Sequence, residues 1–335
     1  MRAEFTRTIL RQPAALDTSA VEVRRQLAGL DPRPWQEGTL CVVGMGASAH
    51  ASHLLVELLS RQGRRVTALS AGSFAGKDDS YRPADSYVLI SESGESVEVL
   101  DAATRLHRVA PTLAITNAVP SPLTTVTDAH LDLRCGTDSA VYTVGYTTTL
   151  QALALLADWL GAPGPDTDLA QIPHHAGQLL EAGSDTAAVT ARIGQARCVD
   201  VVGHGAHYGS AAEMALMIRE ACRLPSGCHD TYEYLHGPME WLDKRSACIV
   251  FGAGREVELA EFVATTGATT VLATQANRAT IPGVHVVTLP SLGLAATTVV
   301  ETLPMHRLLR DIAASRNLTI EGFRYHQDDR KVSTA

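Results

Sequence analysis

The sequence lacks any apolar run long enough to cross a membrane, and it lacks an excess of positive charge. Its first residues are polar and charged, without the apolar segment of a signal peptide. Lysine and arginine number 28 against 36 aspartates and glutamates, and this net charge of −8 argues against a nucleic-acid or membrane-surface partner. We therefore expect a cytoplasmic protein whose 335 residues form one large or two medium domains.

Sequence patterns for metal and nucleotide binding are also missing. The cysteines form no Cys-X-X-Cys pair, and the spacing of His204, His207 and His229 does not favour tetrahedral ligation. Residues 44–46 (Gly-Met-Gly) resemble a dinucleotide-binding turn, but residues 69–72, after the next strand, hold no acidic residue for a ribose hydroxyl. No Gly-Lys-Ser/Thr follows a strand. We expect neither a metal nor a cofactor, and a reduced compartment for the cysteines.

From residue 39 onward, strand-like apolar segments alternate with helical patterns. In the first half we expect strands at residues 40–43, 65–69, 87–90 and 112–116. Such alternation implies right-handed βαβ units and a parallel sheet. Before it, we expect two helices, the first ending at Gln12-Pro13 and the second covering residues 21–30.

The second half of the chain repeats this layout. Residues 201–205, 248–256 and 272–274 match residues 42–46, 88–96 and 113–116 at nearly the same separation. Three such matches predict a duplicated α/β domain. The predicted segments are a helical lead-in (1–38), a first domain (39–165), a helical linker (166–195), a second domain (196–315) and a C-terminal tail (316–335).

A serine-rich turn, Ser-Glu-Ser-Gly-Glu-Ser at residues 91–96, lies between the strand at 87–90 and an amphipathic helix that begins at Val97. Its hydroxyls can donate to phosphate oxygens, its glycine lets the backbone come close, and the free N–H groups of the helix start face an anion. The alternative is an ordinary serine-rich helix cap.

The repeat favours the phosphate interpretation. In the matched segment of the second half, the serines are replaced by Phe251, Ala253 and Glu256. An aromatic ring and a carboxylate do not accept a phosphate, so we expect only the first half to bind one.

The pattern resembles the sugar isomerase (SIS) superfamily, specifically the double-SIS isomerase domain of glucosamine-6-phosphate synthase and the related deaminases and fructosamine deglycases. The segments that carry the resemblance are residues 9–16, 44–48, 91–96, 115–117, 121–123, 213–220 and 235–238. The resemblance implies an α/β fold of two tandem SIS-type three-layer αβα domains, each with a mainly parallel, flavodoxin-like sheet.

The resemblance implies a role for each matching residue. The phosphate-binding group would comprise Ser48, Ser91, Ser93 and Ser96 with Gly46, Gly94 and Glu92. Glu220 would be the base that moves a proton between C1 and C2, and His236 would open the sugar ring in the neighbouring subunit of a homodimer. Lys331 would lie on a tail that closes over the substrate, and further substrate contacts would come from Tyr142, Glu213 and Met217.

The residues themselves are compatible with these roles. Glu213, Met217 and Glu220 recur at spacings of four and three, which predicts one helical face that is either solvated or lines a site. A carboxylate whose pKa is raised by partial burial suits proton removal beside a carbonyl. His236 stands in a His-Gly-Pro turn and is expected on an exposed loop, where a lone histidine is usually a surface residue; Lys331 stands in a charged tail.

Several positions depart from the family pattern. Met217 and Val144 stand where the family usually has lysines, Glu92 replaces a glutamine, and Tyr142 replaces a small hydroxyl residue. These changes indicate a substrate or reaction other than standard glucosamine 6-phosphate synthesis. Position 2 is not cysteine, so we expect no N-terminal glutaminase nucleophile and no nitrogen transfer from glutamine within this chain.

The resemblance implies a phosphosugar isomerase-type enzyme that acts on a phosphorylated amino sugar or ketose. The reaction would be aldose–ketose isomerisation, with or without deamination, through an enediol or enolamine. A fructosamine 6-phosphate deglycase and a non-catalytic sugar-phosphate sensor are the alternatives. The expected partners are the sugar phosphate and a second copy of the chain, with no nucleic acid and no membrane.

Overall fold

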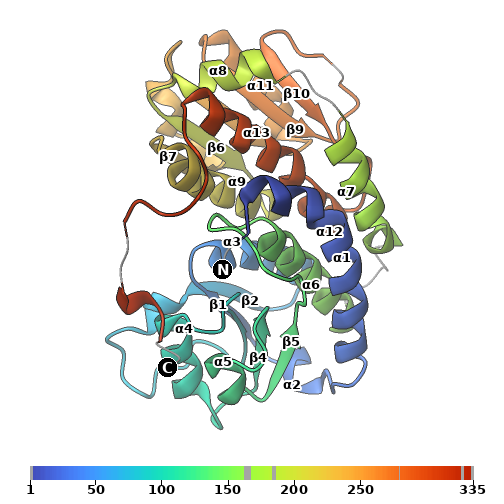
Figure 1. The fold of residues 1–335 in the computed structure, drawn as a ribbon. Helices are drawn as coiled ribbons and strands as arrows, with labels where there is room; N and C mark the ends of the chain where they lie inside the picture. Colours follow the sequence, from blue (N-terminus) through green and yellow to red (C-terminus); the bar gives the residue numbers. More distant parts are fainter. Residues whose placement is uncertain (1–2, 162–166, 183–185, 279, 326–327, 333–335) are drawn as a thin grey trace.

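The computed structural model describes residues 3–161, 167–182, 186–278, 280–325 and 328–332, and it forms two α/β halves (Figure 1). The first sheet contains β1 (Leu40–Gly44), β2 (Val66–Ser70), β3 (Ser86–Ile90), β4 (Thr112–Thr116) and β5 (Ala129–Asp132). The second contains β6 (Val199–Gly203), β7 (Ser226–Asp230), β8 (Ala247–Phe251), β9 (Thr269–Thr274) and β10 (Val284–Thr288).

Both sheets are parallel and share one strand order. The orders are β2-β1-β3-β4-β5 and, from the other edge, β7-β6-β8-β9-β10. This is the flavodoxin-like order, in which the second strand lies on one side of the first strand and the later strands lie on its other side. The duplicated α/β fold predicted from the repeat is confirmed.

Helices cover both faces of each sheet. In the first half, α3 (Ala47–Ser60), α6 (Val144–Trp159) and α1 (Phe5–Leu27) pack on one face and α4 (Val97–Leu106) on the other. In the second half, α8 (Ala187–Gly194), α9 (Ala206–Met217) and α13 (Thr302–Ser315) oppose α11 (Arg255–Thr265). Burial on both faces explains why the inner strands read as continuous apolar runs rather than as alternating ones.

Shorter helices complete the chain. They are α2 (Arg33–Gln36), α5 (Pro122–Thr125), α7 (Ile172–Glu181), α10 (Thr231–Tyr234) and α12 (Leu294–Val300), with 3-10 turns at Ala71–Phe74, Thr167–Gln171, Pro238–Trp241 and Asp328–Arg330. Among the residues described, no helix is long and apolar enough to cross a membrane.

The two halves meet where α3 packs against α9. A Cβ atom at Gly209 would lie 2.5 Å from the carbonyl oxygen of His50, so only glycine permits this approach. The rings of His53 and Tyr208 meet edge to face at 4.9 Å, and the Tyr146 hydroxyl donates to the Gly209 carbonyl at 3.3 Å. The helices that follow the first strand of each half therefore form the contact between the halves.

Helix α1 runs unbroken through Pro13, so the prediction of two helices divided at Gln12-Pro13 is wrong. Proline has no N–H to donate to the carbonyl of Ile9, four residues earlier. The side-chain amide of Gln12 donates to that carbonyl instead, at 3.2 Å. The lost backbone bond is thus replaced locally.

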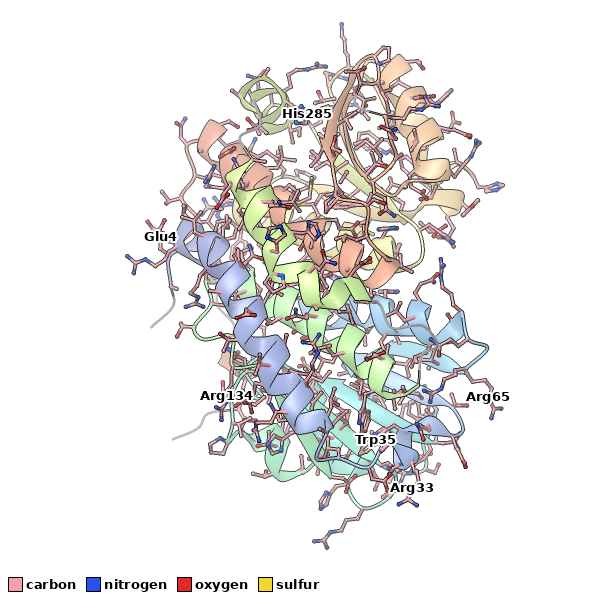
Figure 2. The ribbon with its side chains drawn as sticks, turned by 90° about the vertical axis from the view of Figure 1, so that its right-hand side faces the viewer. Glu4, Arg33, Trp35, Arg65, Arg134 and His285 are labelled. Carbon is pink, nitrogen blue, oxygen red and sulfur yellow. The ribbon has the colours of Figure 1, made fainter. Side chains whose placement is uncertain are left out.

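Packing along the length of α1 also holds it together. Figure 2 shows the helix running down the side of the molecule, from Glu4 beside the second half towards Trp35 and Arg134 in the first. Its buried face includes Phe5 and Ile9, which join the core of the second half, and further residues that join the core of the first half. Burial against both cores outweighs the usual penalty of about 3 kcal/mol for an interior proline.

The second half has no counterpart of the serine-rich turn. Residues 91–96 connect β3 to α4, whereas only residues 252–254 connect β8 to α11. The residue-by-residue match that placed Phe251, Ala253 and Glu256 opposite the serines is therefore wrong, because Phe251 ends the strand. The buried carboxylate of Glu256 accepts from the Gly254 N–H at 3.2 Å and occupies the start of α11 itself.

Candidate functional site

The two motifs of the first half lie side by side at the carboxyl edge of its sheet. The turn at residues 44–48 follows β1 and the serine loop, residues 91–96, follows β3; these strands pair in parallel with Val43 opposite Leu89. Because α3 and α4 leave the two strands on opposite faces, a crevice opens between them, which is where ligands bind in open α/β sheets.

Within the serine loop, two hydroxyls converge. The Oγ atoms of Ser91 and Ser96 lie 3.1 Å apart, and Ser91 is 2% exposed. Gly94 reverses the chain between them with a φ of 63° and donates its N–H to the Ser91 carbonyl at 3.0 Å. A Cβ atom at position 94 would collide with Ser121, so both the conformation and the space require glycine.

The remaining predicted phosphate residues border this loop. Ser93 is half-buried, and its Oγ accepts from the Glu95 N–H at 3.3 Å. Gly46, with a φ of 53°, directly precedes α3, and the half-buried Ser48 stands in the first turn of that helix. Two helix starts, those of α3 and α4, therefore present their N–H groups at this edge of the sheet.

The C-terminal tail reaches the serine loop from the other half of the molecule, as the red segment beside α4 in Figure 1 shows. Lys331 forms an antiparallel backbone bridge with Ser96, and the Val332 N–H donates to the Glu95 carbonyl at 3.0 Å. The Lys331 Nζ lies 3.8 Å from Glu95 Oε2, and the lysine is 45% exposed. The structure thus places Lys331 beside the predicted phosphate-binding hydroxyls.

The Glu92 side chain lies against Asn117 and beside Gly145 at the start of α6. Burial raises the pKa of its carboxyl group and the charge of Asp138 adds to this, while the Asn117 amide, Lys331 and the Tyr142 hydroxyl oppose it without reversing the shift. The Asn117 Nδ2 donates to Glu92 Oε1 at 3.1 Å. Tyr142 and Lys331, singled out separately in the sequence, therefore both act on Glu92.

Sequence reasoning missed Asp138, which fixes the segment that carries Tyr142. Its buried carboxylate accepts from the backbone N–H groups of Ser139 at 2.7 Å, Thr143 at 2.9 Å and Gly145 at 2.7 Å. Asp138 lies five residues before Thr143, the N-cap residue of α6, so the usual capping signal does not mark it in the sequence.

Glu220 lies in a π-helical turn, Ile218–Cys222, that follows α9. The wider turn rotates Glu220 away from Glu213 and Met217, which line a small interior cavity, whereas Glu220 lines a larger cavity beneath the tail. The prediction that the three side chains share one face is therefore wrong. Single π turns inside helices occur frequently at functional sites.

Glu213 and Met217 belong to the contact between the halves. Glu213 is 3% exposed, and its Oε2 lies 2.9 Å from the His50 Nδ1 on α3. Met217 is buried beside Phe251 and His306. Neither borders the larger cavity beneath the tail, so as substrate contacts they remain predictions.

The cavity that contains Glu220 has a volume of about 490 Å³. It is lined by the end of α9 and by the tail, namely Arg219, Glu220, Arg223, Leu224, Pro225, Phe323, Arg324, Tyr325 and Arg330. Arg330 directly precedes Lys331, which bridges to Ser96. The tail therefore contacts both the Glu220 cavity and the serine loop.

His236 is exposed in the turn after α10, where its N–H donates to the Glu233 carbonyl at 2.9 Å. Since α10 follows β7, this turn lies at the carboxyl edge of the second sheet. Glu220 precedes β7 and lies towards the amino edge. The fold therefore does not bring His236 and Glu220 together along one edge of the second sheet.

His204 and His207, in the second half, pair with separate carboxylates. His204 lies 2.6 Å from Asp230, and His207 lies 2.8 Å from Glu301. Burial lowers the pKa of His207, but the charge of Glu301 and the hydrogen bond to it outweigh burial and raise that pKa overall. Within the described ranges, no three His, Cys, Asp or Glu side chains are grouped to hold a metal ion.

Comparisons with known proteins agree with this architecture. A family model for the SIS domain matches residues 35–158. The isomerizing glutamine–fructose-6-phosphate aminotransferase of Pyrobaculum aerophilum is 28% identical over 254 residues, which are 70% of this chain and 41% of that protein. The chain spans less than half the length of the curated relatives it matches first, 41% and 49%.

Solved structures share the fold over nearly the whole chain. The C-terminal domain of glucosamine-fructose-6-phosphate aminotransferase from Francisella tularensis superposes with a TM-score of 0.84 at 18% identity, covering 96% of this chain and 98% of that one. Glucosamine-6-phosphate deaminase from Thermotoga maritima gives 0.78 at 19% identity, covering 97% and 98%.

Two flavodoxin-like halves packed through α3 and α9, with a serine loop in the first half only, define a tandem α/β protein with one candidate anion-binding edge. Residues 35–158 match the SIS domain, and the second half repeats the strand order of the first. The chain resembles the isomerizing glutamine–fructose-6-phosphate aminotransferases in sequence, and it shares its fold with the C-terminal domain of such an aminotransferase and with glucosamine-6-phosphate deaminase.

Proposed function

We propose that this protein is a phosphosugar isomerase-type enzyme that moves a proton between C1 and C2 of a phosphorylated amino sugar or ketose. One observation carries the proposal: the tail joins the serine loop, through Lys331, to the cavity that contains Glu220, through Arg330. An anion site and a carboxylate base thus border one connected region. The relatives named as aminotransferase and deaminase for such sugars support this choice.

The serine loop would hold the phosphate. The hydroxyls of Ser91 and Ser96, 3.1 Å apart, can each donate to a phosphate oxygen, with Ser48 and Ser93 on either side. The N–H groups at the start of α3 and α4 add a favourable field for a dianion. Lys331 would add a positive charge when the tail is in place.

Glu220 would act as the base. In the open-chain sugar it takes the proton from the carbon beside the carbonyl or imine, which gives an enediol or an enolamine. The same carboxyl group returns the proton to the neighbouring carbon. When nitrogen is attached at C2, hydrolysis of the resulting imine releases ammonia and a ketose phosphate.

His236 would open the sugar ring from a second copy of the chain. Its exposed turn lies at the carboxyl edge of the second sheet and Glu220 lies towards the amino edge. A partner in a homodimer supplies the histidine in this arrangement, and Tyr142 would contact the sugar from the first half.

A product assay tests this function. The protein is incubated with glucosamine 6-phosphate, fructose 6-phosphate and a 6-phosphofructosamine, and with glucosamine as the unphosphorylated control. We expect turnover of a phosphorylated compound only, measured as fructose 6-phosphate with ammonia, or as glucose 6-phosphate. Binding of all three without any turnover would contradict the proposal and favour a sugar-phosphate sensor.

A further inference from the structure

Asp200 is a buried carboxyl group on the inner strand β6 of the second sheet, and it is 3% exposed. Its neighbours on the flanking strands are Gly227 and Cys248. Burying a carboxyl group among apolar side chains is costly unless hydrogen-bond donors stabilise it. The matching residue on β1 of the first half is Cys41, a buried thiol. The sheet itself therefore does not require a carboxyl group at this position.

Two donors from one short segment meet on a single oxygen of Asp200. The Tyr234 hydroxyl donates to Asp200 Oδ2 at 2.7 Å, and the Trp241 Nε1 donates to the same atom at 2.9 Å. Burial raises the pKa of Tyr234, with smaller contributions from Cys248 and Asp200, so the hydroxyl stays protonated and remains a donor. The other oxygen, Asp200 Oδ1, lies 3.5 Å from the His229 Nε2.

Tyr234 and Trp241 lie on either side of the turn that carries His236. Tyr234 is the last residue of α10, and Trp241 is the last residue of the 3-10 turn Pro238–Trp241. Between them, residues 236–238 are exposed. Exposed residues gain little from packing, so the position of this turn depends on how its two ends are held.

Local bonds shape the segment, and Asp200 joins its parts. The Asp230 carboxylate accepts from the N–H of Tyr232 at 2.9 Å and of Glu233 at 3.4 Å, which fixes the start of α10. The His236 N–H donates to the Glu233 carbonyl at 2.9 Å. These bonds stay within the segment. The two bonds to Asp200 connect α10 and the 3-10 turn to each other and to β6.

We propose that Asp200 is a positioning residue for His236, because it fixes both ends of the turn from which the imidazole reaches a sugar ring. This inference rests on the proposed function, because it takes ring opening by His236 from there. Proton transfer requires the two heavy atoms to lie within about 3 Å of each other. A misplacement of about 1 Å can lower a rate about a hundredfold. Asp200 acts through Tyr234 and Trp241 and does not contact the substrate.

The step that His236 assists is ring opening, which needs no co-reactant. The bond between the anomeric carbon and the ring oxygen breaks, and the ring oxygen gains a proton. The anomeric hydroxyl loses a proton and becomes the carbonyl group. An imidazole can both give and take a proton. A sugar phosphate that is already open skips this step, so it separates ring opening from proton transfer between C1 and C2.

Fructose 6-phosphate and its 5-deoxy analogue form a matched pair of substrates. Fructose 6-phosphate closes its ring through the hydroxyl on C5, whereas the analogue lacks this hydroxyl and stays open. NMR in deuterated water measures exchange of the C1 protons of each compound. We expect His236→Asn and Asp200→Ala each to slow the exchange of fructose 6-phosphate about tenfold or more and to change that of the analogue little.

Further variants separate positioning from a folding defect. Asp200→Asn keeps an oxygen that accepts from both donors, so it should retain most of the rate with fructose 6-phosphate. Tyr234→Phe and Trp241→Phe each remove one donor, and each should give a smaller decrease, confined to the sugar that closes its ring. Glu256→Gln is the control, because it removes another buried carboxylate of the second half, at the start of α11. Any decrease in this variant should be equal for the two substrates.

Hydrogen exchange followed by mass spectrometry tests the positioning without any substrate. The amide protons of residues 231–242 should exchange faster in Asp200→Ala than in the wild type, while the rest of the second half is unchanged. Unchanged exchange in this segment, or an Asp200→Ala variant that slows both substrates equally, would overturn the positioning role and leave the proposed function standing.

Two other results would reach further. If His236→Asn kept its rate with fructose 6-phosphate, ring opening by His236 would be overturned, and this inference with it. No exchange with either compound in the wild type, together with no turnover in the product assay, would overturn the proposed function and the inference together.

Discussion

The backbone of Lys331 pairs antiparallel with that of Ser96, the residue that caps α4. The tail that makes this bridge leaves the second half of the molecule, and the next residue, Val332, donates to the Glu95 carbonyl at 3.0 Å. The serine loop of the first half and the C-terminal tail are therefore one structural unit. A ligand at the loop also meets the tail, and this relationship underlies the predictions that follow.

Removing either converging hydroxyl weakens binding of a sugar phosphate. Ser91→Ala and Ser96→Ala each delete a donor to a charged oxygen, a loss of about 1.5–3 kcal/mol, which is roughly tenfold or more in affinity. Titration calorimetry with glucosamine 6-phosphate measures it. Ser80→Ala, in an exposed loop, is the control and should bind like the wild type. Unchanged affinity in both loop variants would place the phosphate elsewhere.

Gly94→Ala destabilises the fold more than a comparable glycine substitution does. A non-glycine residue at positive φ is disfavoured by about 1–2 kcal/mol. Gly63 has a φ of 76° with no atom near its Cβ position, so Gly63→Ala shows this penalty alone. At Gly94 the collision with Ser121 adds to it. Urea unfolding compares the two variants, and equal losses would show that the loop has room for a side chain.

Glu92→Gln stabilises the protein at neutral pH. Folding raises the Glu92 pKa above its usual 4.5, so the folded state binds the proton more tightly and stability falls as pH rises from 4.5 through the folded pKa. The glutamine side chain in the variant does not ionise, so its stability does not fall in this pH range. We expect the variant to unfold at higher urea concentration than the wild type at pH 7, and the difference to vanish near pH 4. A difference that persists at low pH would point to packing and not to charge.

The same substitution also strengthens phosphate binding, since it removes a negative charge beside the loop. Calorimetry at pH 7.5 should give a lower dissociation constant for Glu92→Gln than for the wild type. Weaker binding would mean that the carboxyl group is protonated and donates to the ligand.

His207→Gln destabilises the second half in a pH-dependent way. Folding raises the His207 pKa above 6.5 through Glu301, so the pair contributes fully below pH 6.5, and the contribution is lost as pH rises through the folded pKa. We expect a loss of about 1 kcal/mol or more at pH 6 and a smaller one at pH 9. His204→Gln, at an exposed ion pair, should show little effect at either pH. The reverse pH trend for His207→Gln would contradict the assignment.

Much of the fold could be predicted because each strand is a short apolar run followed by a helical pattern, and because the pattern occurs twice. The continuity of α1 could not, since it depends on the Gln12 side chain replacing the bond that Pro13 removes and on two cores that sequence alone does not reveal. The short connection between β8 and α11 was also missed. Gly254 and Glu256 align with residues of the serine loop when the two halves are compared by sequence alone, although the loop is shorter in the second half.

In the candidate site, the serine loop could be located from neighbouring residues in the sequence. The contacts that distant segments make with it could be found only in the structure. Glu92 and Tyr142 meet because Asp138 fixes the segment between β5 and α6. The π turn that separates Glu220 from Met217 leaves no periodicity signal, since it shifts the pattern only at the helix end. The cavity that contains Glu220 is lined partly by the tail, which is remote in sequence from α9.

Proton exchange in deuterated water tests the central claim most directly. The protein is incubated with glucosamine 6-phosphate or with a 6-phosphofructosamine, and NMR follows deuterium at C1 and C2. We predict that the wild type incorporates deuterium into one of these compounds or its product, that Glu220→Gln does not, and that Glu220→Gln still binds the substrate. Exchange that continues in Glu220→Gln, or a wild type that binds sugar phosphate without any exchange, would contradict the account.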